Sequence, residues 1–162
     1  MDAQIILGVT AIGFVATLLT DLWNLGLKAF FGIPSLNFCL LGRWLLHMPS
    51  GTFMHTSIAA APGRRFECVV GRTAHYTIGI VLAFVFIAIA PDEWLSLPTL
   101  LPALLFGVGT VVFPLFLMQP SFGLGIAGAR TPKPVQTRLK SLMTHTVFGF
   151  GLWGCAVGVN LL

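Results

Sequence analysis

Four long apolar stretches constrain this chain more than any other feature of its sequence. They run over residues 3–20, 73–90, 100–118 and 141–162, and each approaches or reaches the length needed to cross the hydrocarbon core of a bilayer. Lipid offers no partner to backbone N–H and C=O groups, so such segments must form helices, which satisfy those groups internally. We therefore predict an all-α polytopic membrane protein, a four-transmembrane-helix bundle that forms one domain over residues 1–162.

The composition agrees with this class. Hydrophobic residues make up 56% of the chain and charged residues only 9%, whereas soluble domains have roughly 25% charged residues. The net charge of +4 comes from basic residues scattered over short loops, which form no nucleic-acid-binding stripe. We expect the lipid bilayer as a partner and no nucleic acid. The first stretch lacks the basic start and the cleavage site of a signal peptide, so we expect it to remain as a span whose helix continues to about Phe31.

All nine basic residues lie in the loops that join the first to the second and the third to the fourth stretch. They are Lys28, Arg43, Arg64, Arg65, Arg72, Arg130, Lys133, Arg138 and Lys140. The loop between the second and third stretches holds only Asp92 and Glu93. Because basic loops stay in the cytoplasm, this asymmetry predicts that both termini are periplasmic.

Residues 36–61 are harder to interpret. Leu36–Met48 is apolar but shorter than a span, and Pro49-Ser50-Gly51 separates it from a second short run, Thr52–Ala61. We predict a re-entrant or interfacial helical hairpin on the cytoplasmic side. A broken fifth span is the alternative, and it would divide the basic residues between the two sides.

A polar stripe follows the first run of this hairpin. Cys39, Arg43 and His47 recur every four residues, which places them on one helical face, and Ser35 is the expected N-cap.

The cysteines show no CxxC pair and no metal-finger spacing; they are Cys39, Cys68 and Cys155. Two of them fall on the predicted cytoplasmic side, where thiols stay reduced, so we expect packing residues. Small residues on the fourth stretch could allow close helix contact inside the bundle or in an oligomer; they are Gly151, Gly154 and Gly158.

Every histidine lies at the predicted cytoplasmic boundary of the membrane. His75 and His145 begin the second and fourth stretches, and each precedes a glycine by four residues, which indicates a faint internal repeat of two parallel helices. Two imidazoles at one depth could bind a haem or a transition-metal ion. His47 and His55, beside Met48 and Met54, could complete a metal site with ligands suited to copper.

Two other interpretations remain open. One is a transporter, or a transporter subunit, for a small molecule or ion, with Asp21 and Glu67 as titrating groups in its path. Further residues near that path, or behind a metal site, are Arg43, Arg72, Gln119, Arg138 and Ser141. The other is a structural protein in which these residues only anchor helices at the interface. No metalloprotease, nucleophile-elbow or phosphate-loop motif is present, so the sequence leaves enzymatic activity undecided.

A succession of short motifs along nearly the whole chain resembles a bacterial family of small polytopic inner-membrane proteins catalogued as a domain of unknown function. The motifs are Asp21-Leu22-Trp23, Gly42-Arg43-Trp44, His47-Met48-Pro49, Ala74-His75-Tyr76, Met118-Gln119-Pro120 and the run from Arg138 to Gly149. The resemblance implies a bacterial inner-membrane location and no particular activity.

Overall fold

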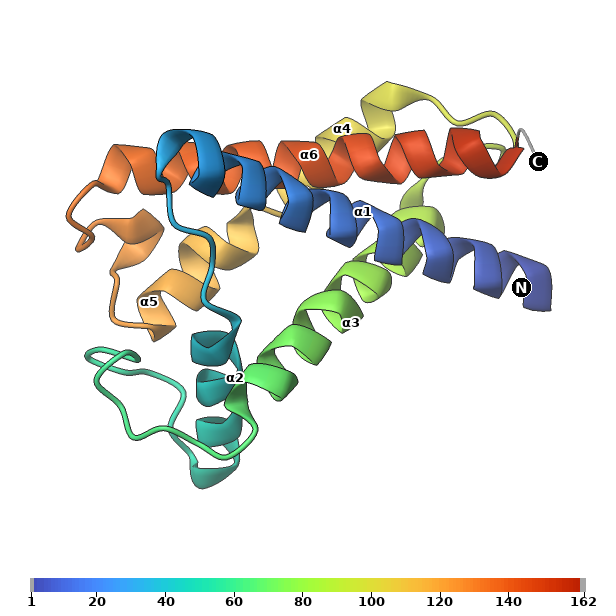
Figure 1. Cartoon of the computed structure of the whole chain (residues 1–162). Coiled ribbons are helices and arrows are strands. Elements are labelled where there is room, and N and C mark those ends of the chain that lie inside the picture. Colours follow the sequence, from blue (N-terminus) through green and yellow to red (C-terminus); the bar gives the residue numbers. More distant parts are fainter. Residues whose placement is uncertain (1, 161–162) are drawn as a thin grey trace. The chain divides into compact units, whose positions relative to one another are not determined.

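The computed structural model describes residues 2–160 and contains helices, turns and loops, with no strand in that range. Its elements, in chain order, are α1 (Ala3–Phe31), α2 (Phe38–His47), η1 (Met48–Ser50), α3 (Glu67–Ile89), α4 (Leu100–Gly109), η2 (Phe113–Met118), α5 (Gln119–Ser121), η3 (Ile126–Gly128) and α6 (Pro134–Asn160) (Figure 1).

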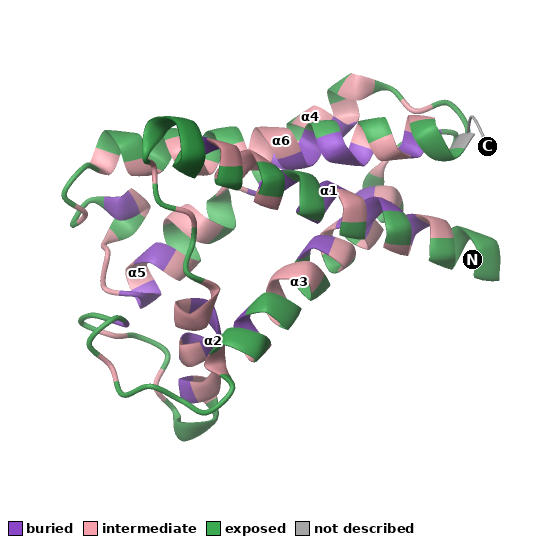
Figure 2. Ribbon diagram, viewed as in Figure 1, coloured by how far each residue is buried: buried purple, intermediate pink, exposed green. Residues whose placement is uncertain are grey.

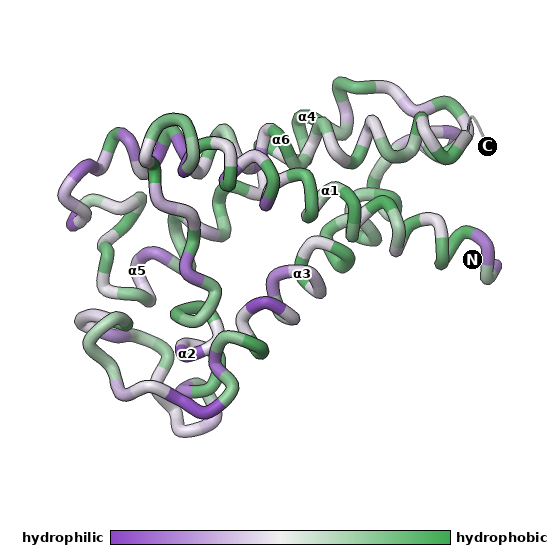
Figure 3. The backbone as a smooth tube through the Cα atoms, in the orientation of Figure 1, coloured by the Kyte–Doolittle hydropathy of each residue, from purple (hydrophilic) through white to green (hydrophobic). Residues whose placement is uncertain are grey.

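Four helical segments are long and apolar enough to cross a membrane: Ala3–Phe31, Glu67–Ile89, Leu100–Ser121 and Pro134–Val159. The predicted fold class, an all-α polytopic membrane protein with four spans, is therefore confirmed. The second and fourth spans, α3 and α6, begin at Glu67 and Pro134, which is earlier than predicted. The apolar pattern misses their first turns because these turns carry polar and charged residues (Figure 3). Such turns suit the polar interface at the end of a span.

The first helix confirms the prediction that it continues to Phe31. Asp2 caps its start and accepts a hydrogen bond from the Ile5 backbone N–H at 2.9 Å. Gly32 ends it with a left-handed φ of 65°, a conformation that glycine adopts without steric cost.

The third span is irregular near Pro114, a residue that is expected to kink a helix. The α4 helix ends at Gly109, a turn follows at Thr110 and Val111, and η2 continues as a π-helix. Proline lacks the N–H that an α-helix needs at this point and its ring crowds the preceding turn, so the helix changes its hydrogen-bonding pattern.

The chain forms two compact units. Unit 1 comprises Met1–Ser35, Tyr76–Thr110 and Thr144–Leu162. Its core holds Val9, Ile12, Phe86 and Leu152, each no more than 2% exposed. Buried positions on α1, α3 and α6 are drawn in purple in Figure 2.

Helix pairs in unit 1 approach closely at glycines. A Cβ on Gly13 of α1 would lie 2.7 Å from the Ile80 Cα of α3, and one on Gly107 of α4 would lie 2.6 Å from the Gly149 Cα of α6. A Cβ on Gly151 would lie 2.7 Å from the Ala16 Cα of α1. Small residues thus permit tight packing of three helix pairs, as is usual in membrane bundles.

Unit 2 comprises Leu36–His75 and Val111–Met143. A small core of Leu41, Trp44, Ile58 and Phe122 holds it together. Only the first arm of the predicted hairpin is helical, as α2 and η1; residues 52–66 form turns and irregular backbone instead. The prediction of a helical second arm is therefore wrong, and the membrane depth of residues 36–61 stays a prediction.

Candidate functional site

The polar stripe of α2 gathers the polar contacts of unit 2. Asn37, rather than the expected Ser35, caps this helix by accepting a hydrogen bond from the Cys39 backbone N–H at 3.0 Å. Cys39, Arg43 and His47 then each make a specific contact with the loop or with α3. The prediction that they share one face is borne out by these contacts.

Arg43 is the centre of this face. Its guanidinium forms a two-pronged ion pair with Glu67, through Nε to Oε2 at 2.9 Å and Nη2 to Oε1 at 2.8 Å. The remaining Nη1 donates to the carbonyl oxygens of Ile58, Ala59 and Ala61 at 3.0–3.2 Å. The carboxylate also accepts from the Arg64 backbone N–H at 2.8 Å. One arginine therefore joins α2, the loop and the first residue of α3.

Both charges of this pair are largely removed from water, since the Arg43 and Glu67 side chains are only 16% and 15% exposed. The hydrogen bond to the Glu67 carboxylate raises the pKa of Arg43 above its usual value, although burial acts in the opposite direction. The planar fork of arginine matches a carboxylate in a way that lysine cannot. The geometry is that of a permanent structural pair.

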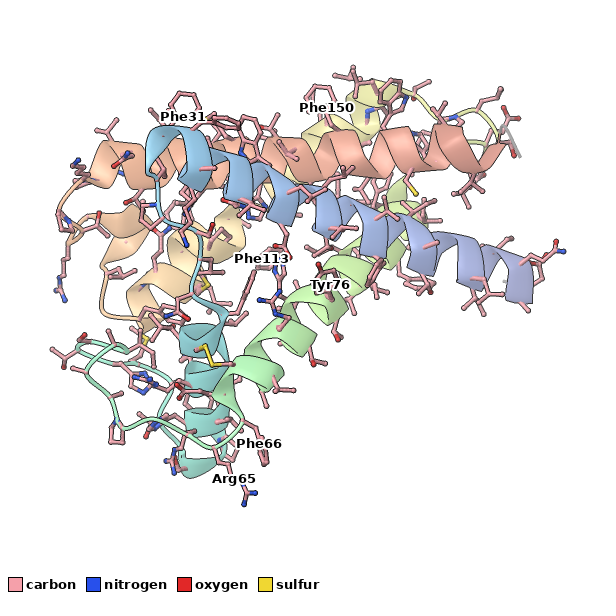
Figure 4. The ribbon with its side chains drawn as sticks, in the orientation of Figure 1. Phe31, Arg65, Phe66, Tyr76, Phe113 and Phe150 are labelled. Carbon is pink, nitrogen blue, oxygen red and sulfur yellow. A yellow bond between two sulfur atoms is a disulfide. The ribbon has the colours of Figure 1, made fainter. Side chains whose placement is uncertain are left out.

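Helices α2 and α3 approach so closely that their backbones touch. A Cβ on Gly42 would lie 2.6 Å from the Gly71 backbone nitrogen, and one on Gly71 would overlap the Phe38 carbonyl. At this crossing Cys39 and Cys68 form a disulfide, drawn as the yellow bond in Figure 4. The expectation that these two cysteines are packing residues without a bond is therefore wrong, because a close helix crossing brings together residues 29 positions apart. Cys155 is free and packs against the core of unit 1.

His47 and His55 meet at the end of the stripe. The His47 side chain is 6% exposed, and its Nε2 lies 3.0 Å from the Pro62 carbonyl oxygen, to which it can only donate. In a neutral ring this leaves the lone pair on Nδ1. The His55 ring lies edge-on to it, with centroids 5.1 Å apart. Both ring nitrogens of His55 are buried and have no hydrogen-bond partner within the described chain.

The loop that carries His55 is fixed by backbone contacts to the segment after η2. The His55 and Ile58 backbone N–H groups donate to the carbonyls of Ser121 and Phe122 at 2.9 and 3.1 Å. Gly123, with φ 84°, leaves no room for a Cβ against the Thr56 carbonyl. The histidine pair therefore lies in an ordered loop.

Two of the remaining predicted residues contact an aromatic ring. Phe38 lies under the Arg72 guanidinium at 5.1 Å and beside the His75 ring at 4.5 Å. His75 is assigned to unit 2, whereas His145 belongs to unit 1. A shared haem or metal for these two histidines stays a prediction.

Gln119, Ser141 and Arg138 lie in unit 2. The Gln119 side chain is 3% exposed and donates to Ser141 Oγ at 3.4 Å, while its Oε1 has no partner among the residues described. Arg138 Nε donates to the Ala127 carbonyl at 2.9 Å. Gln119 and Ser141 are thus in contact, and Arg138 fixes the backbone of η3.

Unit 1 contains the other two predicted polar groups. The Tyr76 hydroxyl donates to Asp21 Oδ2 at 2.9 Å, and Figure 4 labels this tyrosine on α3. His145 Nδ1 lies 2.7 Å from Thr110 Oγ1, whose own proton goes to the Gly107 carbonyl. The histidine and this hydroxyl therefore share a hydrogen bond.

Sequence reasoning gave no role to Tyr76 or Thr110. The signal for the first was available, because it is the only tyrosine of the chain and lies next to His75 at the start of a span. The sequence contains no corresponding signal for Thr110, because a threonine in a proline-containing span is usually a packing residue.

Across residues 2–160 no three His, Cys, Asp or Glu side chains converge in a way that could hold a metal ion. A four-histidine centre therefore has no support. His47 and His55 remain as the pair whose rings contact each other.

The three glycines predicted to allow close helix contact, Gly151, Gly154 and Gly158, have different surroundings. Gly151 packs inside the chain against Ala16, whereas a Cβ on Gly154 or Gly158 would meet nothing within 4 Å. Association of two copies through these glycines stays a prediction.

Four helices long and apolar enough to cross a membrane define the protein as a multi-pass helical membrane protein. It belongs to the family described as Protein of unknown function (DUF2938), which matches residues 10–159. This finding confirms the resemblance to a domain of unknown function. No curated protein and no solved structure matches the chain.

Proposed function

We propose that this multi-pass protein lies in a bacterial inner membrane and binds a soft monovalent metal ion, of the copper(I) type, between His47 and His55. The observation that carries the proposal is the unpartnered ring of His55, whose two nitrogens are buried beside His47. A buried polar group without a partner costs about 1–3 kcal/mol, so such a group in a native protein calls for a ligand or a bound water.

The tautomer of His47 supports the same site. A metal-binding histidine normally donates its other ring N–H to a carbonyl or carboxylate, which orients the ring and raises the basicity of the ligating nitrogen. The bond from His47 Nε2 to the Pro62 carbonyl is of this kind and leaves Nδ1 for a metal.

The number of ligands restricts the metal. Structural zinc sites take four ligands, and magnesium and calcium prefer oxygen. Two imidazoles without a third His, Cys, Asp or Glu suit copper(I), which accepts few ligands and also tolerates thioether sulfur. Met48 and Met54 follow and precede these histidines in the sequence, although the Met54 sulfur accepts a hydrogen bond from Ser121 Oγ at 3.5 Å.

The transporter alternative is less well supported. Both Glu67 oxygens are engaged by Arg43, and one also accepts from the Arg64 backbone, so proton uptake would require breaking this arrangement. The structural alternative, with no ligand, is the opposite outcome of the metal experiment.

The test is a copper(I) titration of the purified full chain in detergent against a colorimetric chelator. We expect one ion per chain, and at least tenfold weaker binding for His47→Gln and for His55→Gln. The matched control is His75→Gln, which removes a histidine of the same unit outside the pair and should bind as the wild type does. Equal binding by all four proteins, or no binding by the wild type, would contradict the proposal. Thermal unfolding of each variant without metal separates loss of the site from loss of the fold.

A further inference from the structure

The disulfide of unit 2 joins the starts of two helices. Cys39 is the second residue of α2 and Cys68 the second residue of α3. Cys68 is exposed at the surface of the unit, whereas Cys39 is half-buried. Of the two cysteines, Cys68 is therefore the one that an attacking thiol is expected to reach first.

We propose that Cys39 and Cys68 form a redox-active pair that exchanges electrons with a dithiol protein of the thioredoxin class. The first turn of a helix has a partial positive charge, which stabilises a thiolate there. In this protein both sulfurs of the reduced pair would benefit, one from each helix. A disulfide whose reduced form is stabilised in this way is an oxidising one, and it is reduced more readily than a structural disulfide.

The charges around the cysteine pair also do not oppose the formation of a thiolate. The acidic neighbour of Cys68 is Glu67, whose charge is compensated by the two-pronged bond with Arg43. Arg72 lies one turn further along α3. The immediate surroundings therefore contain no uncompensated carboxylate that would oppose a thiolate, as judged from the described residues.

The distribution of basic residues gives an independent reason. If the helix ends and loops that carry the nine basic residues face the cytoplasm, this disulfide lies where thiols are normally kept reduced. Cytosolic disulfides are mostly transient, and serve catalysis or sensing. A pair able to close there is expected to cycle between its two forms.

The exchange is balanced in atoms and electrons. A thiolate of the partner dithiol attacks Cys68 Sγ, the Cys39–Cys68 bond breaks, and Cys39 leaves as a thiolate that takes up a proton. The second thiol of the partner then attacks the mixed disulfide and releases Cys68 as a thiol. The partner is oxidised to a disulfide, and the pair gains two electrons and two protons.

The fold of unit 2 can survive this cycle. The Arg43–Glu67 pair and the backbone contact of Gly42 with Gly71 hold α2 against α3 without the covalent bond. Reduction therefore leaves the two thiols close together, ready to close again.

The experiment counts free thiols in cells that express the full chain. Cells are quenched with acid, and thiols are labelled with a maleimide carrying a large polymer, so that each label shifts the band on a gel. Cys155→Ser removes the third cysteine. We expect two labels per chain in untreated cells, none within minutes of adding diamide, and two again after recovery. The wild type keeps Cys155 and should therefore show one label more at each step. The same pattern in both proteins would show that Cys155→Ser has not altered the behaviour of the pair.

Two outcomes would overturn the proposal. A disulfide that is complete in untreated cells and persists with dithiothreitol would be a structural bond in an oxidising compartment. Thiols that diamide leaves open would not form a redox pair. A purified thioredoxin-type protein lacking its second cysteine should trap a mixed disulfide on Cys68. Peptide mapping of the trapped species from the oxidised chain should find the partner's sulfur on Cys68, and a bond to Cys39 instead would contradict the proposed order of attack.

Discussion

Replacing Arg43 with methionine removes five donated hydrogen bonds and leaves the Glu67 carboxylate without its partner. Methionine keeps much of the apolar stem, so the change tests the guanidinium rather than the packing. Breaking a buried ion pair from one side costs about 3–5 kcal/mol. We expect about 3 kcal/mol, the lower end, because both side chains keep some contact with solvent at 16% and 15% exposure.

The assay is thermal unfolding of the full chain in detergent, followed by the fluorescence of its four tryptophans. For a chain of this size a loss of about 3 kcal/mol lowers Tm by roughly 6–12 °C. Glu67→Gln should cost about 1.5–3 kcal/mol, the range for a hydrogen bond to a charged group. The double variant should cost less than the two single costs added, by about 1 kcal/mol or more, because it leaves no unpaired carboxylate.

Arg64→Met is the matched control, since Arg64 is exposed and bonds to Glu67 only through its backbone. Surface substitutions of this kind stay within about 0.5 kcal/mol. If Arg43→Met and Arg64→Met lowered Tm equally, the ion pair would not be the element that holds the loop to α2 and α3.

Three further predictions concern packing, orientation and the bundle. Gly42→Ala should cost about 1–3 kcal/mol by overpacking, whereas Gly154→Ala, which meets open space, should leave Tm unchanged. Cysteine introduced at Asp92 should react with an impermeant maleimide in intact cells, and cysteine at Lys133 only after permeabilisation; the reverse pattern would invert the orientation. Tyr76→Phe should lower stability by about 1.5–3 kcal/mol, because it removes the hydrogen bond to Asp21; no change in Tm would show that water replaces the phenol.

Much of the fold could be predicted because its signals are local. A span is recognised from its own apolar residues, and an irregularity in the third span is expected from Pro114, although the π-helix of η2 is not. The helical face shared by Cys39, Arg43 and His47 follows from their spacing. Each of these inferences needs only residues within one helix.

The candidate site could be predicted only in part, because its contacts join residues far apart in sequence. Arg43 and Glu67 are 24 positions apart, and nothing in either neighbourhood indicates which acid and which base will pair. The start of α3 was expected at residue 73 because its first turns are too polar for an apolar pattern. That error concealed the crossing of α2 and α3, and with it the disulfide.

The faint repeat stays a prediction, with chance as its alternative, but its two matching glycines occupy similar packing positions. Gly79 and Gly149 each follow a histidine by four residues. A Cβ on Gly79 would overlap the Thr17 side chain of α1, and one on Gly149 would lie 2.8 Å from the Ala103 carbonyl of α4. Each glycine therefore packs its helix against the preceding span, as two copies of one helix pair would require.

The charge pattern and the disulfide of unit 2 bear on the same question of compartment, and they give opposite simple answers. Nine basic residues on one side indicate the cytoplasm, while a stable disulfide indicates an oxidising space. A cytoplasmic face is compatible with both only if the bond opens and closes. A periplasmic face is compatible with a permanent bond, but only if all the basic residues violate the usual asymmetry. Labelling at Asp92 and thiol counting in untreated cells can therefore be combined in one test. If Asp92 is labelled from the periplasm, Cys39 and Cys68 should be free thiols in untreated cells. Periplasmic labelling at Asp92 combined with a permanently closed disulfide would contradict the reasoning on both.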